Sequence, residues 1–243
     1  MSIAIKPHLR IVAFLHTWLD SIYQSAENVS RSFPFLINLV LDEHDTRMTR
    51  GEIVFEQFCT IHAIAFERVD ECHQPTPDYI IALGDGRAVA EVKQIDEDEN
   101  FTAISGSRTI GDHVRAKINE ARNQVRVSAN GGKPTILLIY NNLDPLQLFG
   151  TEQHDFVAAM YGEPTLRISV KTGQISDSFE GLNKSFRRGK NDSFSAVGLL
   201  KCTGEGPVVH LYENMYAKVP LEYSRLPEGI TYTRFEVQAH DGA

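Results

Sequence analysis

Apolar residues recur at helical spacing in the first quarter of the chain. Residues 9–29 carry the stripe of an amphipathic helix, and residues 33–41 form a second apolar segment that fits a helix or a strand. After a polar stretch, Thr49 and Glu52 stand three positions apart ahead of the apolar run 53–66, which is the spacing of a capping box. We therefore expect a helix to begin next to Thr49.

Continuous apolar runs farther along the chain predict buried strands. Residues 79–83 are such a run, and residues 87–93, which follow Gly84-Asp85-Gly86, are expected to be the returning strand of a tight β-hairpin. A polar loop is expected over residues 94–111, followed by an amphipathic helix over 112–128 and a buried strand over 135–140. Helices and strands in this order indicate an α/β fold with a mixed sheet flanked by helices.

The C-terminal part of the chain predicts further strands. They are expected near residues 166–170, 196–200, 208–212 and 231–237, and we interpret them as an antiparallel β extension. The expected organisation has three parts, which are an N-terminal helical cap (1–48), an α/β core (49–142) and a β-rich extension packed on the core (143–243).

Composition narrows the classes of function. The 243 residues include 24 basic and 32 acidic side chains, a net charge of −8, which argues against a protein that coats nucleic acid indiscriminately. No apolar run approaches the roughly 18 residues that cross a bilayer. Lys6, His8 and Arg10 interrupt the first apolar stretch, so we expect neither a membrane span nor a signal peptide. The expected location is the cytoplasm.

Two acidic residues and a lysine surround the predicted hairpin. Side chains alternate along a strand, so Glu91 and Lys93 point to one face. Asp78 precedes the first strand, and its partner depends on the turn. That partner is Lys93 in one two-residue turn, Glu91 if the turn lies one residue earlier, and Val92 in a three-residue turn. Every register brings the two carboxylates and the ammonium to one end of the hairpin.

Such a trio of charges suggests a metal site. Neighbouring carboxylates resist ionisation unless they share a cation, and hard oxygen ligands suit Mg²⁺, which keeps several waters and takes few protein carboxylates. A metal held by Asp78 and Glu91 could polarise a phosphoryl oxygen and lower the pKa of a bound water. Lys93 would stabilise the charge of the transition state or orient the attacking water.

The same residues carry a family pattern. A helix with Glu56, then Pro77-Asp78, then Glu91-Val92-Lys93, then a further helix and strand resembles the PD-(D/E)XK nuclease superfamily, which includes many restriction endonucleases and archaeal Holliday junction resolvases. The resemblance lies within residues 49–142. It implies a restriction-endonuclease-like fold and hydrolysis of DNA phosphodiester bonds by water activated on Mg²⁺ or Mn²⁺. It also implies that Asp78, Glu91, Val92 and Glu56 hold the metal and that Lys93 is catalytic.

Two helical positions leave alternatives open. Glu52 competes with Glu56 for the role of the helix acid, but Glu52 already caps the helix, and an unpaired Glu56 carboxylate beside phenylalanines would be costly. We therefore expect Glu56 to be the functional acid. Some members of the superfamily carry Gln-x-x-x-Tyr on the later helix, where this chain has Gln124 but Ser128 in place of the tyrosine. Gln124 lies on one helical stripe with Lys117, so it either approaches the active site or is an ordinary surface glutamine.

An acidic protein needs locally basic surfaces to hold DNA. We expect a track on the helix after the hairpin and a second basic segment that is otherwise a solvated loop. The residues are Lys117, Arg122 and Arg126 on the helix, and Arg187, Arg188 and Lys190 in the segment. The expected function is a Mg²⁺-dependent endonuclease with DNA as its partner, as a monomer or a homodimer. The alternatives are a nuclease-like module that binds nucleic acid or protein without cleaving, and an acidic α/β adaptor.

Overall fold

The computed structural model describes residues 48–70, 76–84, 86–97, 109–143, 150–180 and 183–235. The chain divides into two units at Met48, and the helical cap expected over residues 1–48 lies outside the described residues. The fold described below is that of the second unit, Thr49–Ala243.

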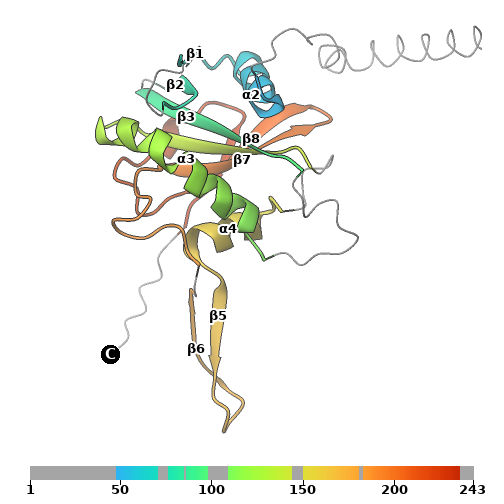
Figure 1. The fold of residues 1–243 in the computed structure, drawn as a ribbon, viewed down its shortest axis with the longest axis vertical. Coiled ribbons are helices and arrows are strands. Elements are labelled where there is room, and N and C mark those ends of the chain that lie inside the picture. Colours follow the sequence, from blue (N-terminus) through green and yellow to red (C-terminus); the bar gives the residue numbers. More distant parts are fainter. Residues whose placement is uncertain are drawn as a thin grey trace, which may run out of the picture. The chain divides into compact units, whose positions relative to one another are not determined.

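A seven-stranded mixed sheet forms the centre of this unit (Figure 1), with the strand order β1-β2-β3-β4-β7-β8-β9. A separate two-stranded sheet pairs β5 with β6. The strands are β1 (Phe66–Arg68), β2 (Tyr79–Leu83), β3 (Gly86–Ile95), β4 (Thr135–Asn141), β5 (Pro164–Ile168), β6 (Ile175–Glu180), β7 (Ala196–Thr203), β8 (Gly206–Glu213) and β9 (Ile230–Thr233). The helices are α2 (Arg50–Ile61), α3 (Asp112–Asn130) and α4 (Gln153–Tyr161), with a 3₁₀ turn at Tyr223–Arg225. The predicted α/β class is confirmed.

The first half of the sheet follows the predicted order with one addition. Strands β1, β2 and β3 are antiparallel neighbours, and β4 joins β3 in parallel after the crossover through α3. The short strand β1 was not predicted, because its three residues, Phe-Glu-Arg, carry two charges and no apolar run. This strand is stabilised by its hydrogen bonds to β2, because a segment this short does not form a stable strand by itself.

The predicted antiparallel extension is wrong for two strand pairs. Strand β7 pairs with β4 in parallel, and β9 pairs with β8 in parallel, whereas β7–β8 and β5–β6 are antiparallel. The reason lies in β4, whose seven residues are all buried. A strand buried in this way needs a hydrogen-bonded neighbour on each edge, and β3 covers one edge. Residues from 196 onward therefore extend the same sheet.

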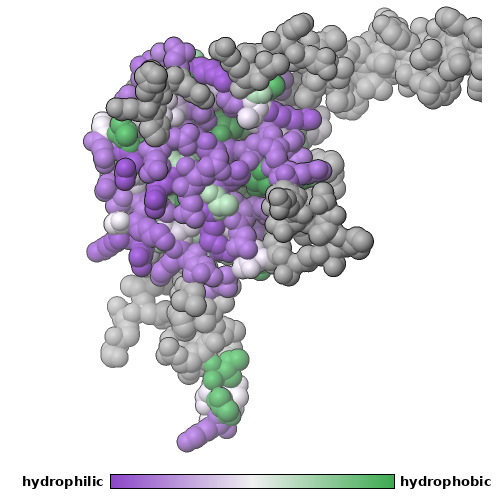
Figure 2. All heavy atoms as spheres, in the orientation of Figure 1, coloured by the Kyte–Doolittle hydropathy of each residue, from purple (hydrophilic) through white to green (hydrophobic). Residues whose placement is uncertain are grey.

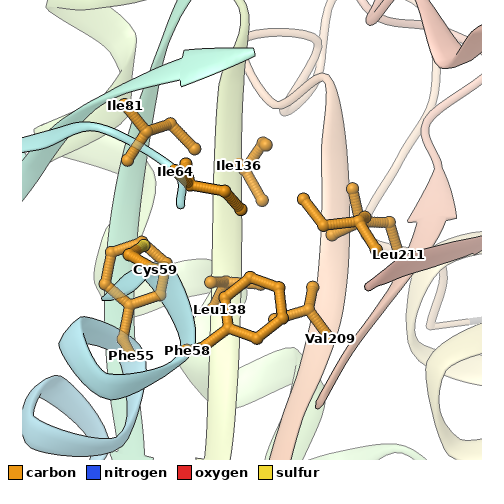
Figure 3. A pocket seen from close by; sticks show the side chains of 10 residues that line it. Phe55, Phe58, Cys59, Ile64, Ile81, Ile136, Leu138, Val209 and Leu211 are labelled. Atoms are coloured by element: carbon orange, nitrogen blue, oxygen red, sulfur yellow. The ribbon is translucent and has the colours of Figure 1, made fainter. Parts of the chain in front are cut away.

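Helix α2 covers one face of the sheet. Its buried side chains, Phe55, Phe58 and Cys59, pack on Ile136 and Leu138 of β4 and on neighbouring strands, where they line a small apolar pocket (Figure 3). The start of α2 is fixed over β3, because the backbone N–H of Gly51 donates to Oε1 of Gln94 at 2.8 Å.

Helices α3 and α4 cover the opposite face, and α3 crosses in front of the sheet in Figure 1. The face of β3 that carries Ala88, Ala90 and Val92 belongs to the α2 layer. The face that carries Ile95 belongs to the α3 layer. Since side chains alternate along β3, the odd-numbered residues Glu91 and Lys93 lie under α3.

The β5–β6 hairpin projects from the rest of the unit (Figure 1). Ile168 and Val170, near its far end, are exposed, and Figure 2 shows an apolar patch near this end, with a hydrophilic tip beyond it, while most of the visible body is hydrophilic. Among the described residues, no helix combines the length and the apolar composition needed to cross a membrane.

The first turn of α3 is anchored to α4 through a buried carboxylate. Gly111, which precedes α3, has a left-handed backbone with φ of 78°, and its N–H donates to Oδ1 of the fully buried Asp155 at 2.9 Å. A Cβ at Gly111 would lie 2.7 Å from the Asp155 carbonyl oxygen and 2.8 Å from the Ala159 nitrogen. Only glycine fits this close approach of backbone to backbone.

We expect Gly111→Ala to lower the free energy of unfolding by about 3 kcal/mol, because the left-handed strain and the backbone clash add. The matched control is Gly132→Ala, since Gly132 has a φ of 74° and nothing within 4 Å of an added Cβ. That change should cost only about 1 kcal/mol. Urea unfolding of both variants measures the difference, and equal losses would show that the contact with α4 is not tight.

Candidate active site

The β2–β3 hairpin closes through a two-residue turn at positions 84 and 85. Leu83 pairs with Gly86 and Tyr79 pairs with Ala90, so this register places Asp78, the residue before β2, next to Glu91. Gly84 takes a positive φ of 56° in this turn, a conformation that glycine adopts without strain. Of the three predicted registers, the structure has the one that places the two carboxylates side by side.

Backbone groups hold the two carboxylates of the pair. The N–H of Asp78 donates to Oε2 of Glu91 at 3.2 Å, and the N–H of Val92 donates to Oδ2 of Asp78 at 2.8 Å. Glu91 therefore accepts a hydrogen bond from the backbone of Asp78, and Asp78 accepts one from the backbone of the residue that follows Glu91. This reciprocal pattern fixes both side chains at the mouth of the hairpin.

The Lys93 ammonium completes the predicted trio. Its Nζ lies 2.6 Å from Oε1 of Glu91, whose side chain is fully buried, while the Lys93 side chain is 16% exposed. The same Nζ lies 3.8 Å from Oε1 of Glu120 on α3. The structure thus brings Asp78, Glu91 and Lys93 together in the layer between β3 and α3.

Burial and like charge make ionisation of the two acids unfavourable. Burial raises the pKa of Asp78, and burial together with the negative charge of Asp78 raises the pKa of Glu91 from 4.5 to about 7. Burial alone would lower the pKa of Lys93, but its bond to Glu91 and the charges of Asp78 and Glu120 raise it. The cluster is therefore short of positive charge, even with the lysine protonated.

This shortage of positive charge fits a divalent cation. Carboxylate oxygens are the ligands that Mg²⁺ prefers, and Mg²⁺ usually takes one or two of them and keeps several waters. Within the described ranges, no three His, Cys, Asp or Glu side chains gather closely enough to hold a metal ion. Asp78 and Glu91 would therefore hold it as a pair, with water and backbone oxygen in the remaining positions.

The two acids of α2 occupy different environments. The predicted capping box is confirmed, since the N–H of Glu52 donates to the Thr49 hydroxyl and Oε2 of Glu52 accepts from the Thr49 N–H at 2.6 Å. Oε1 of Glu52 also pairs with Arg68 at 3.0 Å, and the Glu52 charge is among the causes that raise the pKa of Asp78.

The Glu56 carboxylate is hydrogen-bonded to a residue outside the Asp78–Glu91–Lys93 cluster. Its Oε1 accepts a hydrogen bond from the Tyr79 hydroxyl at 3.0 Å, and Tyr79 belongs to the α2 layer of the core. The expectation that Glu56 is the functional acid rested on the cost of an unpaired carboxylate between aromatic residues. Tyr79 supplies the missing partner, so that reason does not hold, and Glu52 is the helix acid whose charge acts on Asp78.

Helix α3 contributes a residue that sequence reasoning missed. Glu120 lies on the stripe already defined by Lys117 and Gln124, three residues after the first and four before the second, and its Oε2 pairs with the Lys117 ammonium at 2.9 Å. Gln124 is half-buried one turn farther along this stripe. The spacing of Glu120 from Lys117 and Gln124 on the helix is enough to predict that it lies on the same stripe. The superfamily pattern includes no acid at this position, so Glu120 was not predicted.

The candidate DNA-binding residues divide into two groups. On α3, Arg122 and Arg126 are exposed, whereas Lys117 is engaged by Glu120. Arg187 and Lys190 close a tight turn through paired backbone hydrogen bonds of 3.3 and 3.0 Å. That turn precedes β7, which is two strands away from β3 in the sheet. The helix is therefore the basic element that directly covers the cluster.

Comparison with known proteins adds no relative. No protein-family model, curated protein or solved structure matches this chain. The assignment of a function therefore rests on the chemistry of the Asp78–Glu91–Lys93 cluster and on the elements that hold it.

The raised pKa of Glu91 predicts a pH-dependent cost to stability. In the unfolded chain the carboxyl ionises near 4.5, whereas in the folded state it ionises near 7. The fold binds this proton more tightly, so the free energy of unfolding contributed by Glu91 falls as pH rises from about 4.5 to about 7 and is lowest above that range.

We therefore expect Glu91→Gln to raise the free energy of unfolding by roughly 1–3 kcal/mol at pH 8, after allowance for the lost ion pair with Lys93. The gain should be much smaller at pH 5, where Glu91 is protonated in the folded state. Thermal unfolding at both pH values measures this. The control is Glu205→Gln, a change in an exposed turn, which should have little effect. A loss of stability at pH 8 would show that the pair with Lys93 outweighs the repulsion.

Proposed function

We propose that the protein is a Mg²⁺-dependent endonuclease that hydrolyses DNA phosphodiester bonds on a restriction-endonuclease-like core. The observation that carries the proposal is the buried cluster of Asp78, Glu91 and Lys93. A soluble fold rarely retains two adjacent carboxylates with raised pKa values in its interior unless they have a function. The order of α2, the β2–β3 hairpin, α3 and β4 agrees with the pattern that the superfamily resemblance implies.

The proposed roles follow from the positions of the groups. Mg²⁺ held by Asp78, Glu91 and the backbone of Val92 would supply Lewis-acid polarisation of a phosphoryl oxygen and a water of lowered pKa. Lys93 stays protonated because the surrounding carboxylates raise its pKa, and its ammonium can neutralise charge that develops on the phosphate in the transition state. Glu56, which is engaged by Tyr79, has no part in this proposal.

One observation favours a second candidate, a nuclease-like module that binds nucleic acid or protein without cleaving. The Lys93 ammonium already lies 2.6 Å from Glu91, where a catalytic cation would also have to bind. If that ion pair is permanent, it satisfies the charge of Glu91 and leaves Asp78 alone to hold a metal. Metal binding and turnover therefore separate the two functions.

We expect cleavage of plasmid DNA to require Mg²⁺ or Mn²⁺ and to stop in the presence of a chelator. Lys93→Met should lower the cleavage rate by roughly 10²–10³-fold, because it removes a charge that acts on the transition state. DNA affinity in Ca²⁺ should change little. A gel assay of plasmid cleavage and a fluorescence anisotropy titration measure the two effects.

The control for this prediction is Lys133→Met, which removes the same charge from an exposed position just after α3. It should leave the cleavage rate unchanged. Cleavage that persists in chelator would contradict the metal mechanism. A parent protein that binds DNA and metal but never cleaves would support the silent module.

The placement of the basic residues predicts where DNA lies. Each phosphate contact that is lost flattens the slope of log affinity against log salt by about one unit. We expect the double change Arg122→Ala and Arg126→Ala on α3 to lower this slope by about two, because α3 covers the cluster. The triple change Arg187→Ala, Arg188→Ala and Lys190→Ala should lower it by roughly two to three if the turn before β7 also contacts the backbone of DNA.

Salt titrations of DNA binding in Ca²⁺ compare the two sets with the parent protein. An unchanged slope for the triple variant would assign residues 187–190 to a solvated turn. An unchanged slope for the α3 pair would contradict the proposed DNA path.

A further inference from the structure

The Lys93 ammonium lies between two carboxylates that come from different elements. Glu91, on β3 beneath it, is 2.6 Å away and fully buried. Glu120, on α3 above it, is 3.8 Å away and half exposed. The ammonium is therefore bound to the inner carboxylate and stands just beyond close contact with the outer one. A short rotation of the flexible lysine side chain would reverse this preference.

A divalent cation on Asp78 and Glu91 would change the balance between these two positions. An ammonium and a divalent cation on one buried carboxylate are like charges a few ångströms apart, and their repulsion is strong where water is excluded. Lys93 is only 16% exposed, so leaving the cluster for open solvent is not its nearest alternative. The nearest negative charge outside the cation's ligands is Glu120.

Glu120 is already held in place for this contact. Its second oxygen, Oε2, pairs with Lys117 at 2.9 Å, three residues earlier on α3. Oε1 is the oxygen that faces Lys93. The Glu120 side chain is thus already ordered by its partner on the same helix. No further conformational entropy has to be lost at Glu120 when the lysine moves.

We propose that Glu120 is a positioning residue that receives the Lys93 ammonium when a divalent cation binds Asp78 and Glu91. The inference rests on the proposed function and deepens it, because it explains how one buried carboxylate serves a lysine in the metal-free protein and a metal afterwards. Glu120 keeps the Lys93 ammonium close to the cation, where it can act on a phosphate. Without Glu120, Lys93 stays on Glu91 and competes with the metal.

The test measures metal affinity and does not depend on cleavage. Mg²⁺ is titrated into the full chain without DNA by isothermal titration calorimetry, for the parent protein, Glu120→Gln, Lys93→Met and the double variant. We expect Glu120→Gln to weaken Mg²⁺ binding by about three- to tenfold, which lies in the lower part of the range of coupling between residues in contact. In the Lys93→Met background the same change should alter the affinity by less than about twofold, because no ammonium remains to be received.

The control is Glu205→Gln, which removes the same charge from an exposed turn and should leave Mg²⁺ affinity unchanged. Circular dichroism checks that each variant is folded, and Lys93→Gln replaces Lys93→Met in the cycle if the methionine variant does not fold. A parent protein that binds no Mg²⁺ would overturn the proposed function and this inference with it. A parent that binds Mg²⁺ as tightly as Glu120→Gln does would overturn the inference alone. An equal loss in both backgrounds would also overturn it, since Glu120 would then act directly on the metal.

Discussion

The parallel pairing of β3 with β4 is the constraint on which the candidate site depends. Two parallel neighbours cannot be joined by a tight turn, so the chain has to cross one face of the sheet between them. Here the crossover contains α3. That crossing places the stripe of Lys117, Glu120 and Gln124 over the face of β3 that carries Glu91 and Lys93. The same pairing leaves the other edge of β4 open for β7, so the C-terminal strands become part of the sheet.

Backbone groups hold the two acids of the charge cluster in place. Asp78 and Glu91 are bound by N–H groups of the hairpin itself, which form only in one register of β2 against β3. The repulsion between the two acids is therefore offset by the pairing of entire strands. This arrangement lets the fold tolerate a Glu91 carboxyl with a pKa of about 7 in its interior. A protein without a use for that group would be more stable with a neutral residue there.

Much of this arrangement could be predicted from the sequence, where the signals are local. The capping box at Thr49 and the hairpin around Gly84 depend on neighbours in the chain, and both are confirmed. The register of the hairpin stayed open among three alternatives, because the sequence of the turn allows more than one loop length. The charged three-residue strand β1 gave no local signal at all.

Contacts between segments that lie far apart in the sequence could not be predicted from such local signals. Antiparallel order was expected for β7 because it follows other strands in sequence, whereas its partner is the fully buried β4. Glu56 was preferred over Glu52 because nothing in the sequence reveals that the Tyr79 hydroxyl reaches it. The parallel partner of β7 and the hydrogen-bond partner of Glu56 both come from a different part of the chain.

The edges of the main sheet and of the hairpin differ in a way that bears on self-association. The outer strands β1 and β9 have only three and four residues, and β1 carries Glu67 and Arg68. Short, charged edges of this kind offer a poor template for a strand of another molecule. In the described part of the chain, β5 and β6 pair only with each other and end in the exposed Ile168 and Val170. At high protein concentration, intermolecular strand pairing would therefore begin at this hairpin, and shortening it would improve solubility without disturbing the seven-stranded sheet.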